Sequence, residues 1–307
     1  MAERFLVSVD LKNLQAENGF DLKTISYLDR VHVTVNPETR QYAADFLRKH
    51  FDQFIAFCDC TALEDDLEGI VFLLNSGATK VFVTYWQLKA IVEERLLTGG
   101  DLKRLIVSFD HSVCEGDPEI RARSILGELK AFVPDVSSIG IQVHDVHDWK
   151  LLDAMHRMSK TEDYPSRYVT LAYNTRDHYI KAVKDGHVAI VPASELTTDP
   201  KKYPLLLPAH LLITTGLTSD RHDGLFPTVV CDEHETCLGL VYSSEASIAK
   251  ALEIGRGVYQ SRRRVEPWIK GETSGDIQEL ISITLDCDAD ALQFIVRQKG
   301  TGKCYLR

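Results

Sequence analysis

The chain has 307 residues, of which 44% are hydrophobic and 26% charged, with 18 Gly and 10 Pro. This composition excludes a wholly disordered, collagen-like or disulfide-scaffold chain, and the length predicts two domains or one large one. The net charge of -10 argues against a general nucleic-acid or anionic-membrane binder, so we expect neither as a partner.

The sequence shows no targeting or membrane-spanning segment. The N-terminus, Met1-Ala2-Glu3-Arg4, lacks the basic and apolar regions of a signal peptide. No apolar run approaches the roughly 20 residues that span a bilayer. Seven cysteines, an odd number, then indicate free thiols or metal ligands in a reducing compartment. We therefore expect a cytoplasmic protein.

Residues 1–205 are predicted to form an α/β domain of repeated βα units. Asn36-Pro37-Glu38 predicts a helix start, and Gly77 is a typical residue just beyond a helix end. Short β-branched runs are mostly separated by stretches of helical period, which indicates a largely parallel sheet. Both a barrel-like and a doubly wound arrangement fit this repeat. The predicted strands are Phe5–Val9, Val31–Val35, Phe54–Phe57, Val81–Thr84, Leu105–Phe109, Ile139–Val143, Tyr168–Tyr173 and His187–Val191.

Polar residues follow several of these strands. Helix capping and turn chemistry explain such residues in general. The carboxyl ends of the strands are also where both architectures build sites, so a phosphosugar-binding barrel is a further hypothesis. The residues are Asp59, Asp110, His111, His144, Asp145 and Asn174.

Residues 206–307 are predicted to form a second, small β-rich α+β domain. The segment Thr197–Pro208 is rich in Pro and Lys and is typical of a linker. After it, Leu225–Cys231 and Cys237–Tyr242 are predicted strands. A helix is expected from Ser244 to about Ile254, ending at Gly255 or Gly257.

An arginine pair is the first candidate site in this domain. On a strand, Arg262 and Arg264 would share one face. Two neighbouring guanidinium groups repel each other unless an anion lies between them, and Arg binds phosphate well. The alternative is a solvated basic edge that prevents aggregation.

A glycine-bracketed loop is the second candidate. Gly271 and Gly275 flank Glu272, Thr273 and Ser274, and such a loop can approach a phosphate or polar ligand closely. Just before it, Trp268 is suited to stacking on a base. The alternative is a plain turn next to a core tryptophan.

The third candidate is the run Asp286-Cys287-Asp288-Ala289-Asp290. On an extended strand, the three aspartates would lie on one face and Cys287 on the other. Carboxylate oxygens suit Mg²⁺ and a thiolate suits Zn²⁺, so one strand could serve two metals. The alternative is a charged turn.

These motifs together resemble the phosphoribosyl-AMP cyclohydrolase family over Asp223–Cys304. The local sequence of this domain is most similar to that of the fungal trifunctional histidine biosynthesis proteins, and the N-terminal region is similar to their leader domain. The matching stretches are Asp223-Gly224-Leu225-Phe226-Pro227, Tyr259-x-Ser261-Arg262-x-Arg264, Trp268-x-Lys270-Gly271-Glu272-Thr273-Ser274-Gly275 and Asp286-Cys287-Asp288-Ala289-Asp290-Ala291-Leu292.

The resemblance implies a metal-assisted hydrolysis of the adenine ring of 1-(5-phosphoribosyl)-AMP between N1 and C6. It implies Mg²⁺ on Asp286, Asp288 and Asp290, and Zn²⁺ on Cys287 and Cys304, in a homodimer. We further expect substrate binding by a set of residues in the first two candidate sites, while no catalytic residue is assigned. The set is Arg262, Arg264, Trp268, Lys270, Glu272, Thr273 and Ser274.

This sequence departs from the family pattern between the two arginines, where Arg263 replaces the usual serine, and at its C-terminal end. A histidine follows the family's second cysteine, where this chain has Tyr305, and a third zinc cysteine falls beyond Arg307. Catalytic zinc normally takes three protein ligands, so the domain is expected to be incomplete at its C-terminal end. The second hypothesis is therefore a catalytically silent nucleotide-binding or interaction protein.

Overall fold

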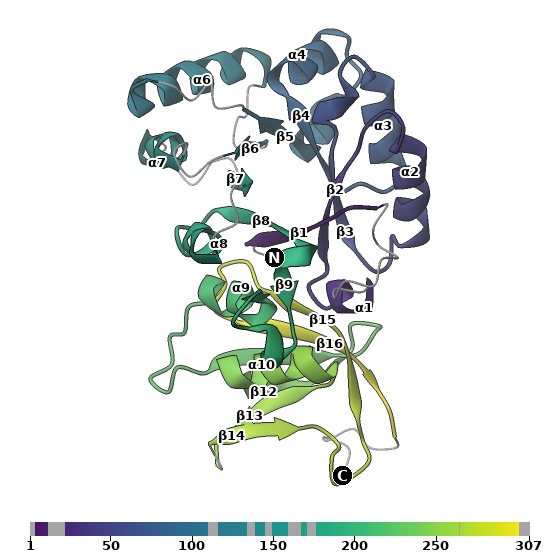
Figure 1. The fold of residues 1–307 in the computed structure, drawn as a ribbon, viewed down its shortest axis with the longest axis vertical. Coiled ribbons are helices and arrows are strands. Elements are labelled where there is room, and N and C mark those ends of the chain that lie inside the picture. Colours follow the sequence, from purple (N-terminus) through teal and green to yellow (C-terminus); the bar gives the residue numbers. More distant parts are fainter. Residues whose placement is uncertain are drawn as a thin grey trace. The chain divides into compact units, whose positions relative to one another are not determined.

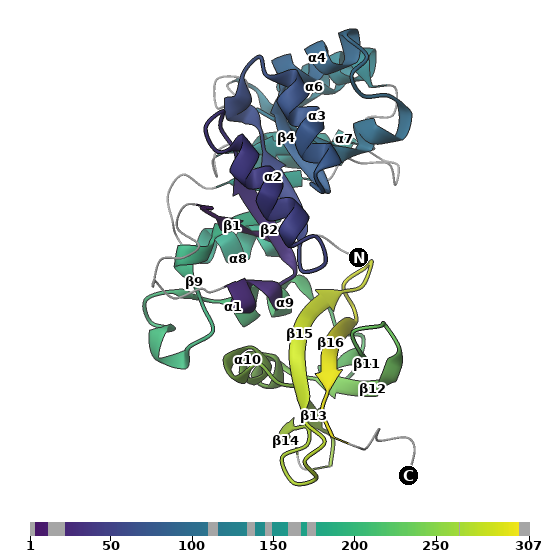
Figure 2. The ribbon, with the colours of Figure 1, turned by 90° about the vertical axis from the view of Figure 1, so that its right-hand side faces the viewer.

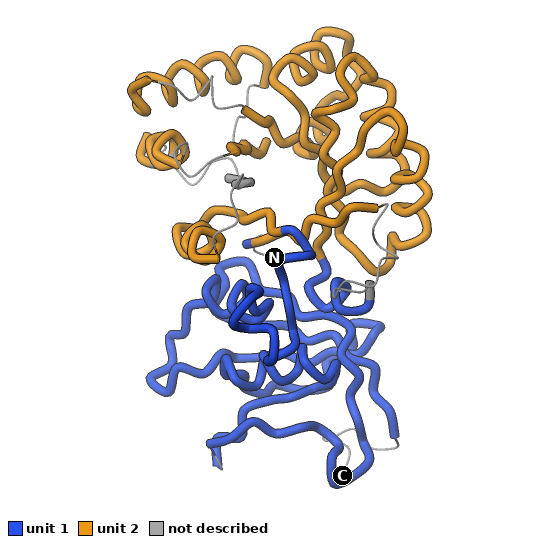
Figure 3. The backbone as a smooth tube through the Cα atoms, viewed as in Figure 1, with its two compact units in different colours: residues 1–4, 15–29, 192–307 blue, residues 5–14, 30–191 orange. Residues whose placement is uncertain are grey.

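The computed structural model describes residues 4–11, 22–109, 116–133, 139–144, 149–158, 167–170, 176–263 and 265–300. The chain forms two compact units, shown in Figure 3. Unit 2 comprises Phe5–Leu14 and Arg30–Val191, and unit 1 comprises Met1–Arg4, Gln15–Asp29 and Pro192–Arg307. Three segments before the predicted 205/206 boundary group with the second half of the chain: Met1–Arg4, Gln15–Asp29 and 192–205.

Unit 2 is a closed barrel of eight strands in sequence order, with parallel neighbours (Figure 1). The prediction of repeated βα units is confirmed, and of the two architectures that it allowed, the barrel is the one observed. The strands are β1 (Phe5–Val9), β2 (Arg30–Thr34), β3 (Ile55–Asp59), β4 (Lys80–Thr84), β5 (Leu105–Ser108), β6 (Gly140–Val143), β7 (Arg167–Thr170) and β8 (Val188–Pro192).

Helices connect successive strands of the barrel, and local chemistry fixes their ends. Thr84 and Gln87 form a capping box that starts α4, and the α3 helix ends before Gly77, whose φ is +117°. The predicted helix start at Asn36 is three residues early, since the Asn36 side chain accepts the Thr39 N–H and holds a turn. The helices are α2 (Arg40–Lys49), α3 (Leu67–Asn75), α4 (Tyr85–Glu93), α6 (Pro118–Phe132), α7 (Trp149–Met158) and α8 (Arg176–Lys184), with 3₁₀ turns η1 (Thr61–Leu63) and η2 (Gly99–Arg104).

Unit 1 contains a four-stranded mixed sheet in the order β12-β11-β16-β15 and a separate hairpin, β13–β14. The predicted helix α10 is confirmed, since Ser244 and Ser247 form its capping box and Gly255 ends it with a φ of +63°. The strands are β11 (Phe226–Cys231), β12 (Cys237–Ser243), β13 (Val258–Ser261), β14 (Glu266–Ile269), β15 (Gln278–Leu285) and β16 (Leu292–Gln298), and the helices are α1 (Leu22–Ser26), α9 (Ala209–Gly216) and α10 (Glu245–Ile254).

Two other segments complete unit 1. The Tyr27 carbonyl accepts the Ile283 N–H at 2.8 Å, which ties the residues after α1 to β15. Figure 2 shows α1 close to β15, although the two are far apart in the sequence. The segment predicted as a linker carries short paired strands, β9 (Leu196–Thr197) and β10 (Leu207–Pro208), and is preceded by η5 (Ala193–Glu195) and interrupted by η6 (Pro200–Lys202).

Within the described ranges, none of the helices is both long and apolar enough to cross a membrane.

Candidate functional site

The aspartate run is a turn between β15 and β16, not a strand. The Asp286 carboxylate accepts the backbone N–H groups of Asp290 at 3.1 Å and Ala291 at 3.2 Å. Ala289 has a φ of +63°, which reverses the chain. The strand geometry predicted for this run is therefore wrong, because side-chain to backbone hydrogen bonds of Asp close the turn before the strand can continue.

This turn gathers potential metal ligands on one side. One ligand atom from each of Asp286, Cys287 and Asp288 lies within 4.8 Å of the others. Cys287 thus accompanies two aspartates instead of facing away from them, which corrects the two-faced arrangement expected from the sequence. Two carboxylates and a thiol at this spacing fit a divalent cation, and the Cys287 and Asp288 side chains are exposed.

The carboxylates of the turn influence each other. Burial acts to raise the pKa of Asp286, but hydrogen bonds from the Ala291 N–H, the neighbouring aspartates and the Asp290 N–H outweigh it and lower that pKa. The pKa of Asp290 is raised by its hydrogen bond to Asp286 and by the charge of Asp288. A bound cation would relieve this crowding of negative charge.

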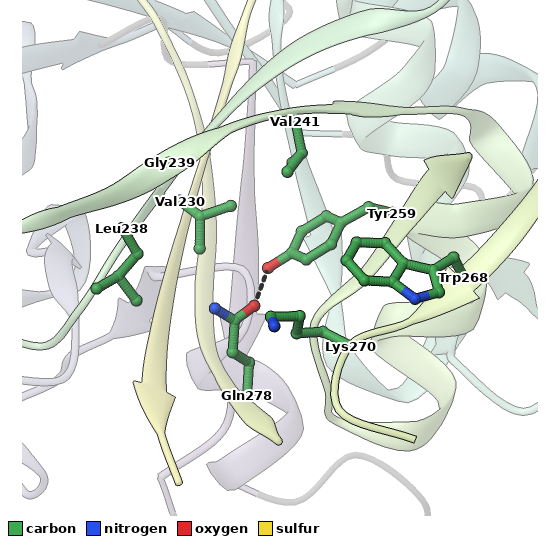
Figure 4. A pocket seen from close by; sticks show the side chains of 8 residues that line it. All are labelled: Val230, Leu238, Gly239, Val241, Tyr259, Trp268, Lys270 and Gln278. Carbon is green, nitrogen blue, oxygen red and sulfur yellow. Dashed lines mark hydrogen bonds between the residues drawn. The ribbon is translucent and has the colours of Figure 1, made fainter. Parts of the chain in front are cut away.

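A small pocket lies beside the β13–β14 hairpin (Figure 4). Its volume is about 40 Å³. The Tyr259 hydroxyl donates a hydrogen bond to Gln278 Oε1 at 2.7 Å, and the Gln278 amide donates to Gln298 at 3.0 Å. Lys270 is buried, and its ammonium lies 5.9 Å from the centre of the Trp268 ring. The lining residues are Val230, Leu238, Gly239, Val241, Tyr259, Trp268, Lys270 and Gln278.

The glycine-bracketed loop follows directly after Lys270. Glu272, Thr273 and Ser274 are exposed. A side chain at Gly271 would place its Cβ 2.4 Å from the backbone of Asp276, and the φ there is +82°. The close approach that requires glycine is therefore between two parts of the chain itself. The structure brings Trp268 and Lys270 to the pocket and leaves Glu272, Thr273 and Ser274 on the surface beyond it.

Arg262 lies in the turn after β13, outside the strand in which it was expected. Its guanidinium carbon is 4.6 Å from the centre of the Tyr242 ring, and that of Arg221 is 4.4 Å from the same centre. Arg221 also makes two hydrogen bonds to the Asp223 carboxylate, at 2.9 and 2.6 Å. The aromatic ring therefore collects two cations in one cluster, in which Arg262 is exposed and Arg221 and Tyr242 are half-buried.

Sequence reasoning missed Tyr242 and Arg221 as parts of this cluster. The only available signal was the neighbouring Asp223-Gly224 turn, since the stacking partners are far apart in the sequence. Two predicted site residues, Arg264 and Cys304, lie outside the described residues. Cys231 and Cys237 lie opposite each other on β11 and β12. Among the described residues, neither belongs to a cluster of side chains that could hold a metal ion.

The chain thus joins an eight-stranded barrel to a small α+β unit whose β15–β16 turn gathers two carboxylates and a thiol. Residues 239–307 match the phosphoribosyl-AMP cyclohydrolase family. The chain is 33% identical over 305 residues to the histidine biosynthesis bifunctional protein of Schizosaccharomyces pombe, covering 97% of this chain and 68% of that protein. It therefore belongs to the family of fungal histidine biosynthesis multifunctional proteins, with a cyclohydrolase-type domain at residues 239–307.

Two other relatives delimit the match. The histidine biosynthesis trifunctional protein of Neurospora crassa is 35% identical over 285 residues, which cover 92% of this chain and 30% of that protein. The phosphoribosyl-AMP cyclohydrolase of Ruegeria sp. is 47% identical over 78 residues, covering 25% of this chain and 60% of that protein. The chain thus spans under a third of the Neurospora crassa protein.

Proposed function

We propose that this chain hydrolyses the adenine ring of 1-(5-phosphoribosyl)-AMP in histidine biosynthesis. In this reaction a water oxygen bonds to C6, the C6–N1 bond breaks, and a proton passes to N1. The observation that carries the proposal is the gathering of Asp286, Cys287 and Asp288 within 4.8 Å in a unit that matches the cyclohydrolase family.

Metal assistance is part of the proposal. Asp286, Asp288 and Asp290 would hold Mg²⁺, and Cys287 with Cys304 would hold Zn²⁺. Bound zinc supplies a water whose pKa is lowered toward 7, and magnesium neutralises and orients anionic oxygens. The turn supports this assignment because its hydrogen bonds hold the Asp286 carboxylate in place before any ion arrives.

The remaining predicted residues would bind the substrate. Arg262, fixed by its stacking on Tyr242, presents a guanidinium suited to a phosphate, as Arg264 would. Trp268 and Lys270 would contact the nucleotide beside the pocket. The exposed Glu272, Thr273 and Ser274 would supply polar contacts to the phosphoribosyl arms.

A homodimer is proposed as the working form. Val229 and Leu240 are paired across β11 and β12, and their side chains are 36% and 56% exposed. A second copy of the chain would cover this apolar pair. A Leu240→Lys variant would then have a lower mass by light scattering, whereas a monomeric wild-type chain would contradict the dimer.

We also propose a cytoplasmic location. The cysteines of the described residues are free, as a reducing compartment would keep them.

The activity test uses the purified chain with Zn²⁺ and Mg²⁺ and follows opening of the adenine ring by absorbance. Turnover is expected for the wild type and for Asp52→Asn, a matched control at an exposed aspartate of the barrel unit. Asp288→Asn is expected to lose activity. Binding of phosphoribosyl-AMP with no turnover above the rate without protein would instead support the catalytically silent nucleotide-binding hypothesis.

A further inference from the structure

The interior of the barrel in unit 2 changes character along its strands. Its apolar core contains Leu6, Phe57, Phe82 and Ile106, together with Val188 and Ile190 of β8. Side chains two residues apart on a strand share a face, so the next inward positions toward the carboxyl ends follow directly. On β1, β3, β4 and β5 they are polar, namely Ser8, Asp59, Thr84 and Ser108, whereas on β8 the position after Ile190 is Pro192.

This polar layer is unusual for a barrel that has only to pack its interior. Bulky branched residues normally fill the layers of such barrels, and burying polar groups is costly unless they are paired. Thr84 has a structural use, since its hydroxyl caps α4 by accepting the Gln87 N–H. The other members need a separate explanation.

His32 of β2 is the centre of the layer. It is 4% exposed, and its ring stands edge-on to Phe82 with the centroids 5.1 Å apart. Its Nδ1 lies 3.1 Å from the Ser8 hydroxyl, whereas its buried Nε2 makes no hydrogen bond among the described residues. Burial lowers the pKa of His32 more than the nearby Asp59 charge raises it, and His144 lowers it further, which favours the neutral ring.

Asp59 faces this unused nitrogen across a gap. One of its oxygens, Oδ1, is occupied by the N–H and hydroxyl of Thr61, at 3.0 and 2.6 Å. The other, Oδ2, is 3.8 Å from His32 Nε2, which is too far for a hydrogen bond. When the Ser8 hydroxyl donates to Nδ1, the single ring proton is on Nε2. A donor and an acceptor then face one another at a spacing that a third group can bridge.

A hydroxyl is the group that meets both demands, because it accepts one hydrogen bond and donates another. A second pair continues the layer, as the Ser108 hydroxyl lies 2.7 Å from His144 Nε2 just beyond β6. Asp59 is the only carboxylate among Ser8, His32, Asp59, Thr84, Ser108 and His144, so the layer suits neutral hydroxyls better than an anion.

We propose that the carboxyl end of the barrel binds a polyhydroxylated small molecule, a sugar or polyol, with one hydroxyl held between His32 Nε2 and Asp59 Oδ2. The sugar is free or is part of a sugar phosphate, and the shared chemistry is the hydroxyl. A single water is the competing occupant. This site is separate from the aspartate turn, so it stands or falls independently of the proposed hydrolysis.

The test is an NMR titration of the full chain labelled at histidine, with the His32 resonance assigned by its loss in His32→Gln. The probes are ribitol, D-ribose, D-ribose 5-phosphate and inorganic phosphate, each up to about 50 mM because free sugars bind weakly. Saturable shifts of His32 with ribitol or D-ribose support the proposal and a free-sugar source. Shifts with D-ribose 5-phosphate, but with neither D-ribose nor inorganic phosphate, also support it and assign the source as a sugar phosphate.

Variants locate the contact. Asp59→Asn is expected to weaken the affinity at least tenfold, and His50→Gln, at a histidine on the barrel's outer face whose ring bonds to Gln53, is expected to leave it unchanged. Should Asp59→Asn misfold, Ser108→Ala serves in its place and is expected to weaken binding at least threefold. Absence of any His32 shift, or equal shifts with inorganic phosphate alone, overturns the proposal.

Discussion

Replacing Gly271 with alanine is expected to destabilise unit 1 much more than the same change at Gly275. Both glycines have left-handed backbones, with φ of +82° and +78°. At Gly271 an added Cβ would lie 2.4 Å from the carbonyl carbon and oxygen of Asp276, whereas none of the described residues beyond its chain neighbours lies within 4 Å of a Cβ added at Gly275. The pair therefore separates backbone strain from a steric clash.

The magnitudes follow from these two environments. A non-glycine residue in the left-handed region costs about 1–2 kcal/mol, which is the whole penalty expected for Gly275→Ala. Gly271→Ala adds the cost of forcing two backbone segments apart, about 1–3 kcal/mol more. Its total is then about 2–5 kcal/mol, a large fraction of the stability of a small domain.

Urea unfolding measures the difference, with Trp268 as the fluorescent reporter of this unit. The hydrogen exchange of the Lys270 N–H, which donates to the Gly257 carbonyl at 2.9 Å, gives a local check in the native state. Gly271→Ala should speed that exchange more than Gly275→Ala does. Equal losses of unfolding free energy in the two variants would refute the reasoning, because the close approach at Asp276 would then cost nothing.

Three further outcomes are expected. Tyr242→Leu should raise the KM for phosphoribosyl-AMP several-fold with little change in kcat, because Arg262 loses the ring on which it stacks; an unchanged KM would exclude that role. The hydrogen bonds from Arg221 lower the pKa of Asp223 to about 2. This pairing therefore stabilises the folded chain above the ordinary pKa of 3.8, and the stabilisation is lost as the pH falls toward 2. Asp223→Asn should remove this part of the acid dependence of unfolding measured by circular dichroism. Iodoacetamide, followed by mass spectrometry, should label the exposed Cys287 but not the buried Cys58, because burial raises the pKa of the Cys58 thiol to about 12. Zn²⁺ should slow the labelling of Cys287. Equal labelling of Cys287 with and without Zn²⁺ would argue against metal binding at the turn.

The barrel was largely predictable because its signal is local. Strands and helices alternate at a spacing that only βα units produce, and residues such as Gly77 mark helix ends directly. The choice between a closed barrel and an open sheet was not predictable in this way. It depends on whether the first and last strands meet, and no single strand carries that information.

At the aspartate turn, the sequence predicted the kind of site but not its geometry. Its residue types indicated a metal site, and the structure does bring Asp286, Cys287 and Asp288 together. The alternation rule failed there because the Asp286 carboxylate competes with the sheet for backbone N–H groups, and this competition is decided only when β15 and β16 pair. Chemistry was therefore readable from the composition of the run, whereas geometry required the fold.

The polar layer of the barrel was only partly predictable from the sequence. The two-residue spacing from Phe57 to Asp59 is visible in the sequence, but it is equally consistent with a strand end that caps a helix. The parallel pairing of β2 with β3 sets Asp59 beside His32, with one carboxylate oxygen already used by Thr61 and the other facing a nitrogen that makes no hydrogen bond within the described chain. Capping explains the first oxygen and leaves the second unexplained. The second Asp59 oxygen, which capping does not use, is the reason why a bound ligand explains the polar layer better than helix capping does.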